Sequence, residues 1–288
     1  MKTMPGRIVT ADQLREAQLW MAHQAAAPQH SHDLLLAAAT GRVLARPLHL
    51  PDTDGKARQL DPGTRLDWYL LPLLAAGGHI SVPVFAPVRC AIVAVQADSD
   101  GDAQARDASV VAVMLQAAMT ELGVRSVSSN LNLPPSASAA SLSRFARHCD
   151  LLLVIDDSAT RRPAAAGLAP PPIYEIDGCP CLVLPRSALA ALSQFVVFGV
   201  PLIRRLQGRS LDLPPLRTAT EAGTDLRLRC SSALVCVSAH GDGDAIQVRP
   251  CAPCDALPGP DFAPVSGVAW RPEGQRLLTY LPLAEWLH

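Results

Sequence analysis

The sequence is poor in aromatic residues and has no excess of charge of either sign. Phe, Trp and Tyr make up 4% of its 288 residues, and 25 Lys and Arg stand against 26 Asp and Glu. Nucleic-acid binding usually needs a basic surface and aromatic stacking platforms, so this composition argues against it. The formal net charge of -1 and the 49% apolar content instead predict a soluble globular protein with a sizeable core.

Targeting and membrane signals are also missing. Residues 1–10 contain charges but no apolar run followed by a small-residue cleavage site, the pattern of a secretory signal. The longest apolar stretch, residues 189–206, is interrupted by polar residues, by Gly199 and by Pro201, which argues against a membrane span. We therefore expect a cytoplasmic protein that does not contact membranes.

The eight cysteines form no complete metal-binding pattern. Cys179-Pro-Cys181 and Cys251-Ala-Pro-Cys254 have ligand-like spacing, but no matching Cys or His pair lies nearby to complete four zinc ligands. The chain is also far longer than a small disulfide scaffold, so reduced thiols are expected. Motifs for serine hydrolases, zinc proteases, P-loop NTPases and dinucleotide binding do not occur, so the sequence gives no support for those activities.

What the sequence does contain is an alternation of buried-strand and helix patterns. Continuous apolar runs predict buried strands at 90–95, 124–128, 151–155 and 181–184. Helical patterns lie at 108–122, 138–148 and 188–207, the last one broken around Gly199 and Pro201. This order is typical of a doubly wound α/β domain with a parallel sheet.

The two ends of the chain have a different character. Helical patterns are predicted at 11–26, 32–40 and 64–77, with a strand at 42–50. After Gly208, short β-like runs such as 226–229, 233–238 and 245–248, separated by Gly, Asp and Pro, predict a small β domain. We therefore expect an N-terminal helical and strand segment over 1–60, an α/β domain over 61–209 and a small C-terminal β domain over 210–288.

Three segments of this chain resemble the molybdopterin molybdenumtransferases, the family of the bacterial MoeA proteins and the gephyrin E domain. Ala38-Ala-Thr-Gly-Arg-Val-Leu-Ala45 is similar to the family's A-x-G-R-V-L-A. Asp61-Pro-Gly-Thr-Arg-Leu66, followed by 71–84 and 88–93, resembles its G-x-x-L, L-A-x-x-G, V-x-V and P-x-V-A stretch. Residues 184–208 align with its L-P-G-N-P-V-S-A helix, ending at Leu206-Gln-Gly208.

The resemblance implies a fold and a chemistry. It implies a three-layer molybdopterin-binding domain and elongated homodimers. It also implies insertion of molybdate into adenylylated molybdopterin with release of AMP, aided by Mg²⁺. The family places an inserted domain between its first strand and the D-P-G-T segment, and this chain has only Gly55 to Leu60 in that place.

The segments that carry the family's chemistry depart from its pattern. The T-G-D-E segment corresponds to Val95-Gln-Ala-Asp98, which keeps a single carboxylate for catalysis or Mg²⁺, although Mg²⁺ usually takes one or two carboxylates besides phosphate oxygens. The S-G-G turn becomes Ile155-Asp156-Asp157, so a phosphate cradle is replaced by two negative charges. The P-G-K-P loop corresponds to Pro170-Pro-Pro172 and has no cation.

Two further segments supply candidate substrate-binding residues. The L-P-G-N-P turn is Leu184-Pro-Arg186-Ser187-Ala188, which loses glycine and asparagine but gains an arginine. The family's D-S-N helix start corresponds to Asp107-Ala-Ser109. Each candidate also has a plainer interpretation: Asp98 as a helix cap, Asp156-Asp157 as a polar turn, and Arg186 as a solvated side chain in an exposed turn.

Three hypotheses about function remain open at this stage. The leading one is a divergent family member linked to molybdenum cofactor biosynthesis or handling. It would have lost or reduced catalysis and bind molybdopterin or its adenylylated form, as a homodimer, as a heterodimer with an intact paralogue, or with a molybdoenzyme client. The second is an active transferase that uses relocated ligands Asp98, Asp107 and Arg186. The third is a structural interaction module without pterin affinity.

Overall fold

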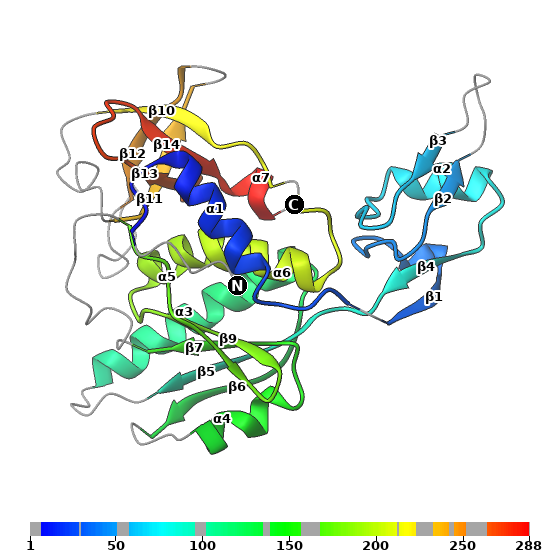
Figure 1. The fold of residues 1–288 in the computed structure, drawn as a ribbon, viewed down its shortest axis with the longest axis horizontal. Coiled ribbons are helices and arrows are strands. Elements are labelled where there is room, and N and C mark those ends of the chain that lie inside the picture. The colour runs from blue at the N-terminus through cyan, green and yellow to red at the C-terminus, as the bar shows by residue number, and fades with distance from the viewer. Residues whose placement is uncertain are drawn as a thin grey trace.

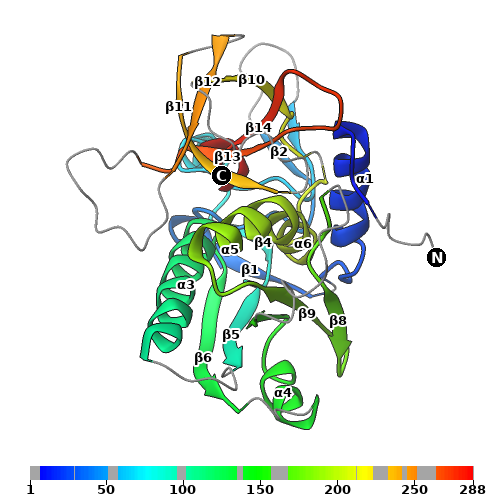
Figure 2. The ribbon, with the colours of Figure 1, turned by 90° about the vertical axis from the view of Figure 1, so that its left-hand side faces the viewer.

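The computed structural model describes residues 7–28, 30–50, 58–95, 102–134, 139–156, 168–211, 213–222, 233–241, 245–251 and 264–287. Figure 1 shows three groups of elements: a central sheet flanked by helices, a β-barrel beside it, and a smaller lobe set to one side. The 90° view of Figure 2 shows the barrel strands stacked above α5 and α6, with the sheet below them. The predicted α/β class is confirmed.

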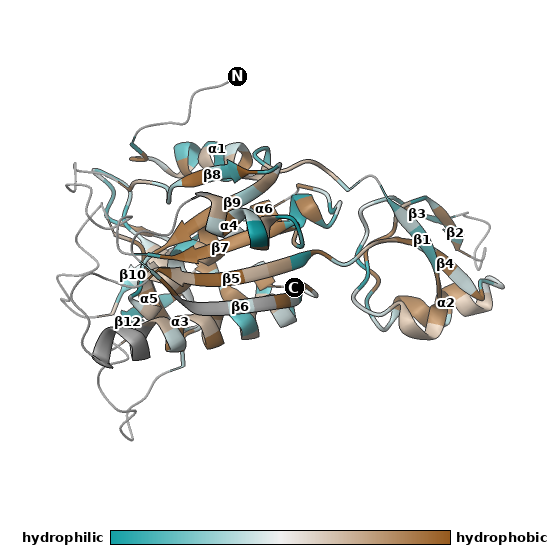
Figure 3. Cartoon of the chain, turned by 90° about the horizontal axis from the view of Figure 1, so that it is seen from below, coloured by the Kyte–Doolittle hydropathy of each residue, from teal (hydrophilic) through white to brown (hydrophobic). Residues whose placement is uncertain are grey.

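The central sheet has five strands in the order β6-β5-β7-β9-β8. These are β5 (Arg89–Val95), β6 (Arg125–Leu133), β7 (Leu151–Ile155), β8 (Ile173–Ile176) and β9 (Cys179–Leu184). The pairs of β5 with β6, β5 with β7, and β7 with β9 are parallel, whereas β8 pairs antiparallel with β9. Figure 3 shows β5 and β7 coloured mainly as apolar residues, as expected for strands with covered faces.

Helices pack on both faces of this sheet. Alternate residues such as Cys90, Ile92 and Leu153 share one core with α3 (Asp102–Glu121) and α5 (Ala188–Gln194). The intervening residues, such as Val93 and Val154, share a second, smaller core with α4 (Ala139–Ala146). The period-2 alternation of a strand therefore divides the sheet between two cores.

The long apolar helix is interrupted as an α-helix around Gly199 and Pro201, as predicted, but its helical turns continue through the interruption. It runs from α5 through the π-helical turn η3 (Phe195–Gly199) into α6 (Val200–Leu206). The wider π turn accommodates Pro201, which has no backbone N–H to donate. Residues 188–206 are long and apolar enough to cross a membrane, but most of this helix is buried against the rest of the protein, as in the core helix of a soluble fold.

The N-terminal helix belongs to the main body, and its sequence explains both its start and its place. α1 (Ala11–Ala22) is capped by Thr10, whose hydroxyl oxygen accepts a hydrogen bond from the Gln13 N–H. In return, the Gln13 side-chain oxygen accepts a hydrogen bond from the Thr10 N–H, which completes a capping box. Its buried face, which includes Leu14 and Met21, joins the core of α6 and η3.

The small lobe is built from segments on both sides of residue 60. It contains β1 (Ser31–Leu35), the 3₁₀ turn η1 (Leu36–Ala38), β2 (Leu48–Leu50), β3 (Arg58–Leu60), α2 (Leu70–Ala76) and β4 (Ser81–Phe85). β1 pairs antiparallel with β4, and β2 with β3. The predicted domain boundary at residue 60 falls inside this lobe, and the three-domain division stays a prediction.

Two helix predictions in the lobe need correction. The predicted helix over 32–40 is the strand β1 followed by η1, because all five residues of β1 pair with β4. The predicted helix over 64–77 is confined to α2, since residues 64–66 form extended backbone hydrogen bonds with Arg42 and Leu44. In both places a tertiary partner overrides local propensity.

The lobe meets the main body where two glycines approach each other. A Cβ on Gly63 would lie 2.9 Å from the carbonyl oxygen of Gly208, and one on Gly208 would lie 2.5 Å from the Phe85 ring. Both glycines have a positive φ, a backbone conformation that residues with a side chain rarely adopt. These residues belong to the Asp61-Pro-Gly-Thr and Leu206-Gln-Gly segments, so two of the family-like segments form this junction.

The C-terminal part is a closed barrel with the strand order β10-β12-β11-β13-β14. Its strands are β10 (Arg217–Glu221), β11 (Val235–His240), β12 (Gln247–Pro250), β13 (Gly267–Trp270) and β14 (Leu278–Pro282), followed by α7 (Leu283–Leu287). Closure removes the exposed edges that short strands would otherwise present. Strands predicted at 233–238 and 245–248 correspond to β11 and β12, and one predicted at 226–229 lies outside the described residues.

Candidate functional site

The carboxyl ends of the parallel strands form the edge at which this kind of sheet usually binds ligands. Ala94, Ile155 and Leu184 lie side by side across β5, β7 and β9. The chain leaves the sheet there through Val95, Asp156 and Pro185. The candidate residues that follow these three strands are therefore brought to one edge.

Arg186 is the central residue of this edge. Its side chain reaches past the end of β7, and its Nη2 donates a hydrogen bond to the carbonyl oxygen of Val95 at the end of β5. Arg186 is only 6% exposed. The interpretation of Arg186 as a solvated turn residue is therefore wrong: the guanidinium ties two strand ends together beneath the surface.

Asp156 and Ser187 flank this arginine. The backbone N–H of Asp156 donates to the Leu184 carbonyl at 2.9 Å, so the chain keeps its sheet register for one residue beyond β7. Because β7 lies between β5 and β9, the Asp156 carboxylate and the Arg186 guanidinium share this edge. Ser187 is exposed and precedes α5 as its N-cap residue, with no capping hydrogen bond from its side chain.

The other candidates are not brought to the edge by described contacts. Asp98 and Asp157 lie outside the described residues. Asp107 belongs to α3, but its side chain is not described, and Ser109 is exposed on the same helix. Among the described residues no group of three His, Cys, Asp or Glu side chains could hold a metal ion.

The described part of this edge does not fit the phosphates and Mg²⁺ of an adenylylated pterin. Phosphate binding needs cations or converging backbone amides, but the Arg186 guanidinium already donates to Val95 and the neighbouring side chain, Asp156, is acidic. Magnesium prefers an octahedral set of oxygen ligands, of which Asp156 supplies one described carboxylate here. We therefore derive no reaction step through these groups.

Buried thiols are grouped beneath the same sheet, at the opposite ends of the strands. The Sγ atoms of Cys149 and Cys179 lie 3.8 Å apart, and both thiols are buried. Their hydrogen bond raises the pKa of Cys179 and lowers that of Cys149. Burial raises the pKa of Cys90, and it raises the pKa of Cys181 to about 12. Cys90 and Cys181 therefore remain protonated thiols at neutral pH.

A second buried cation lies where α6 meets the C-terminal helix. Arg204 is 4% exposed, and its Nη2 donates to the carbonyl oxygens of Glu285 and Trp286 at 3.4 and 3.3 Å. Burial and the nearby Arg65 lower the pKa of Arg204 to about 10. Because it binds the carbonyl end of α7, this arginine holds the barrel against the helical core.

The fold and this edge together define an α/β protein with a parallel sheet, a closed β-barrel and a separate lobe. No family model matches the sequence, and no curated protein sequence matches it. Solved structures do match, and three of them are described as proteins of molybdenum cofactor or molybdopterin biosynthesis.

A molybdenum cofactor biosynthesis protein from Pyrococcus furiosus has a TM-score of 0.62 at 18% identity, over 93% of this chain and 97% of that one. A molybdopterin biosynthesis MoeA protein from Pyrococcus horikoshii has a TM-score of 0.61 at 14% identity, over 92% and 96%. A MoeA protein from Pyrococcus horikoshii OT3 has a TM-score of 0.58 at 13% identity, over 93% and 99%. The chain therefore has a MoeA-like fold along nearly its whole length.

Proposed function

We propose that this chain is a divergent member of the molybdopterin molybdenumtransferase family, linked to molybdenum cofactor biosynthesis or handling. In this proposal it acts in the cytoplasm as a binding or partner protein with lost or reduced catalysis. The likeness to MoeA proteins over more than nine-tenths of the chain supports the family assignment. The observation that carries the loss of catalysis is Arg186, whose guanidinium is buried against the Val95 carbonyl.

A partner role is supported by apolar side chains exposed on the small lobe. Trp68 is 74% exposed and Ile80 is 81% exposed. The Trp68 ring makes an edge-to-face contact with the Tyr69 ring. The Leu36 N–H donates to the carbonyl of Ile80, so Ile80 lies beside Leu35. Large exposed apolar groups on a small lobe favour burial against another protein. We propose that the partner is a second copy of this chain or an intact paralogue, with a molybdoenzyme client as a further candidate.

Isothermal titration of the purified protein with adenylylated molybdopterin tests the binding role. Titrations with and without Mg²⁺ and molybdate separate a pterin-binding protein from a transferase. Weak binding that neither Mg²⁺ nor molybdate strengthens, without AMP release, is the expected result, because the Arg186 guanidinium donates to Val95 and Asp156 repels a phosphate. Formation of active cofactor at an ordinary rate would show that the loss of catalysis is wrong.

The two alternative functions predict different outcomes in the same experiment. An active transferase with relocated ligands releases AMP in a Mg²⁺-dependent reaction that the substitution Asp98→Ala abolishes. A purely structural module shows no heat with molybdopterin or its adenylylated form at micromolar concentrations. The acidic Asp156 at the strand end favours this third function over the second, because it repels a phosphorylated ligand.

Sedimentation of the double variant Trp68→Ser, Ile80→Ser tests the partner surface. We expect the wild-type chain to form a dimer in the micromolar range and the variant to sediment as a monomer. The matched control is Val113→Ser, which changes an exposed apolar residue on α3 outside the lobe. Equal association of wild type and the lobe variant would contradict a partner surface on the lobe.

A further inference from the structure

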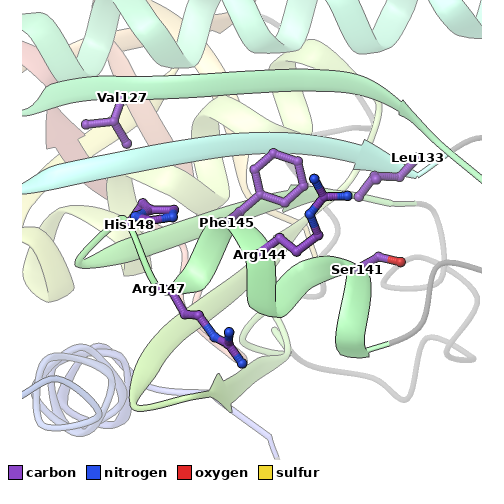
Figure 4. Close-up of a pocket in the computed structure, with 7 residues that line it drawn as sticks. All are labelled: Val127, Leu133, Ser141, Arg144, Phe145, Arg147 and His148. Carbon is purple, nitrogen blue, oxygen red and sulfur yellow. The ribbon is translucent and has the colours of Figure 1, made fainter.

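A groove lies along the outer strand of the central sheet, outside the edge that carries Arg186. It has a volume of about 710 Å³ and lies between β6 and α4, which Figure 4 shows from the side. It extends from Val127 near the start of β6 to Leu133 at its end. The six steps of strand from Val127 to Leu133 span roughly 20 Å, so the groove runs along most of β6.

The floor of the groove is apolar. Val127 and Leu133 come from β6, and the Phe145 ring comes from α4. Phe145 is only partly buried and packs against the smaller core, so one side of its ring belongs to the fold. A flat or branched apolar group in the groove would cover the other side and lose contact with water.

The rim of the groove carries one guanidinium. Arg144 and His148 are exposed, and among the described residues none forms a hydrogen bond or ion pair with either side chain. Ser141 precedes Arg144 by three residues on α4, which places its hydroxyl on the same side of the helix. In Figure 4 the Arg144 guanidinium points toward Leu133 at the carboxyl end of the groove.

Two acidic residues close to α4 in sequence or space are already engaged. Asp177 pairs with Arg147 at 3.2 Å, and Figure 4 shows Arg147 directed away from Arg144. Asp150 pairs with Arg89 at 2.9 Å. Residues 139–146, which form α4, include no Asp or Glu. The Arg144 guanidinium, which has no ion-pair partner among the described residues, therefore favours an anion, which it can bind through two parallel hydrogen bonds.

The geometry of β6 decides between an added peptide strand and a small molecule. β6 is an edge strand, but its register with β5 shifts twice, between Cys90 and Ala91 and between Val93 and Val95. Such irregularities disrupt the ladder of backbone groups that a peptide strand would need. The volume of the groove, in contrast, lies within the range of roughly 300–1,000 Å³ that is typical of small-molecule sites.

We propose that this groove is a binding site for a small amphipathic anion, with an apolar body on Val127, Leu133 and Phe145 and a carboxylate or phosphate on Arg144. The Ser141 hydroxyl, on the same side of α4 as Arg144, supplies a further donor to this anion, whereas His148 lies toward the Val127 end of the groove. The groove shares no lining residue with the Arg186 edge, although Leu133 pairs with Val95, so the site is tested by its own probes and variants.

Titration with naphthalene derivatives tests this site on the full chain. The probes are 2-naphthoate, 2-naphthyl phosphate and the neutral 2-naphthamide, measured by equilibrium dialysis at low salt. We expect one equivalent of at least one of the anions to bind, and the amide to bind about tenfold more weakly, because a charge-assisted hydrogen-bond pair contributes about that factor. The stronger of the two anions identifies the head group. Equal binding of the amide and the anions would overturn the proposal.

Three variants locate the bound probe. Arg144→Gln changes an exposed residue and should weaken anion binding about tenfold without changing amide binding. Arg276→Gln, an exposed arginine beside the barrel, is the matched control and should bind as the wild type does. Trp68→Ser removes the exposed aromatic ring of the lobe and should also leave binding unchanged. Absence of anion binding at millimolar concentration, unchanged binding in Arg144→Gln, or loss of binding in Trp68→Ser would each refute the assignment.

Discussion

Replacing Arg186 with methionine should destabilise the folded chain. Methionine keeps an unbranched apolar stem but removes the donor, so the Val95 carbonyl loses the hydrogen bond that ties β5 to the segment after β9. An acceptor left unsatisfied in a buried position costs about 1–3 kcal/mol, and hydrogen bonds to charged groups contribute about 1.5–3 kcal/mol. We therefore expect the free energy of unfolding to fall by about 2 kcal/mol.

Urea denaturation at pH 7, followed by far-ultraviolet circular dichroism, measures this change. The midpoint should fall while the dependence on urea stays the same, as for a change in folded-state stability alone. Arg276→Met is the matched control, because this exposed arginine contributes little, and Arg186→Lys should fall between the two. If Arg186→Met has wild-type stability and instead loses affinity for adenylylated molybdopterin, then Arg186 contacts the ligand and does not act as a tie between strand ends.

Three further predictions concern the barrel, the core and the buried thiols. Gly267→Ala would place a Cβ against the Tyr280 ring, closer than van der Waals contact allows, so thermal unfolding should show a loss of about 2–3 kcal/mol, and an unchanged melting temperature would contradict this packing. Phe198→Ala, at a fully buried ring, should cost about 3–5 kcal/mol in urea denaturation, whereas Val113→Ala, at an exposed residue, should change stability by less than about 0.5 kcal/mol. Burial raises the pKa of Cys181 from 9 in the unfolded chain to about 12 in the folded protein. The protonated thiol therefore contributes its full stabilisation below pH 9, and this stabilisation is lost as the pH rises toward 12. The wild type should therefore lose up to about 1.4 kcal/mol per pH unit relative to Cys181→Ala between pH 9 and 12, and parallel profiles would contradict this.

The hydrophobic pattern was sufficient to predict the sheet, because its strands are buried on both faces. Residues 151–155 are a continuous apolar run, and all five are buried in β7. Helices α3 and α4 and strand β9 also fall where the pattern placed them, to within a few residues at most ends. Strand β8 was not predicted, because Ile173-Tyr-Glu-Ile176 is a short, half-exposed edge strand. The backbone hydrogen bonds of β8 with β9 hold these residues in a strand that their own hydrophobic pattern does not predict.

The lobe shows where local pattern is insufficient. The Leu- and Ala-rich residues 32–40 match a helix as well as a strand, and pairing with β4, nearly fifty residues later, decides the strand. The family-like glycines were visible in the sequence, but the contact between Gly63 and Gly208 was not. Contacts of this kind depend on where distant segments meet, which a periodicity does not encode.

The candidate site divides in the same way. The sequence by itself determined which residues follow each strand: the acidic pair after β7 and the arginine after β9. It also determined that these segments lack the glycines and the lysine of the family that they resemble. Only the tertiary structure decided what Arg186 does, because burial and the Val95 carbonyl come from a strand more than ninety residues earlier. The groove beside Arg144 likewise exists only because the fold places α4 beside the edge strand β6. Residue types fix which chemistry a chain has available, whereas the packing of distant segments fixes which charges are satisfied inside the fold and which remain for a ligand.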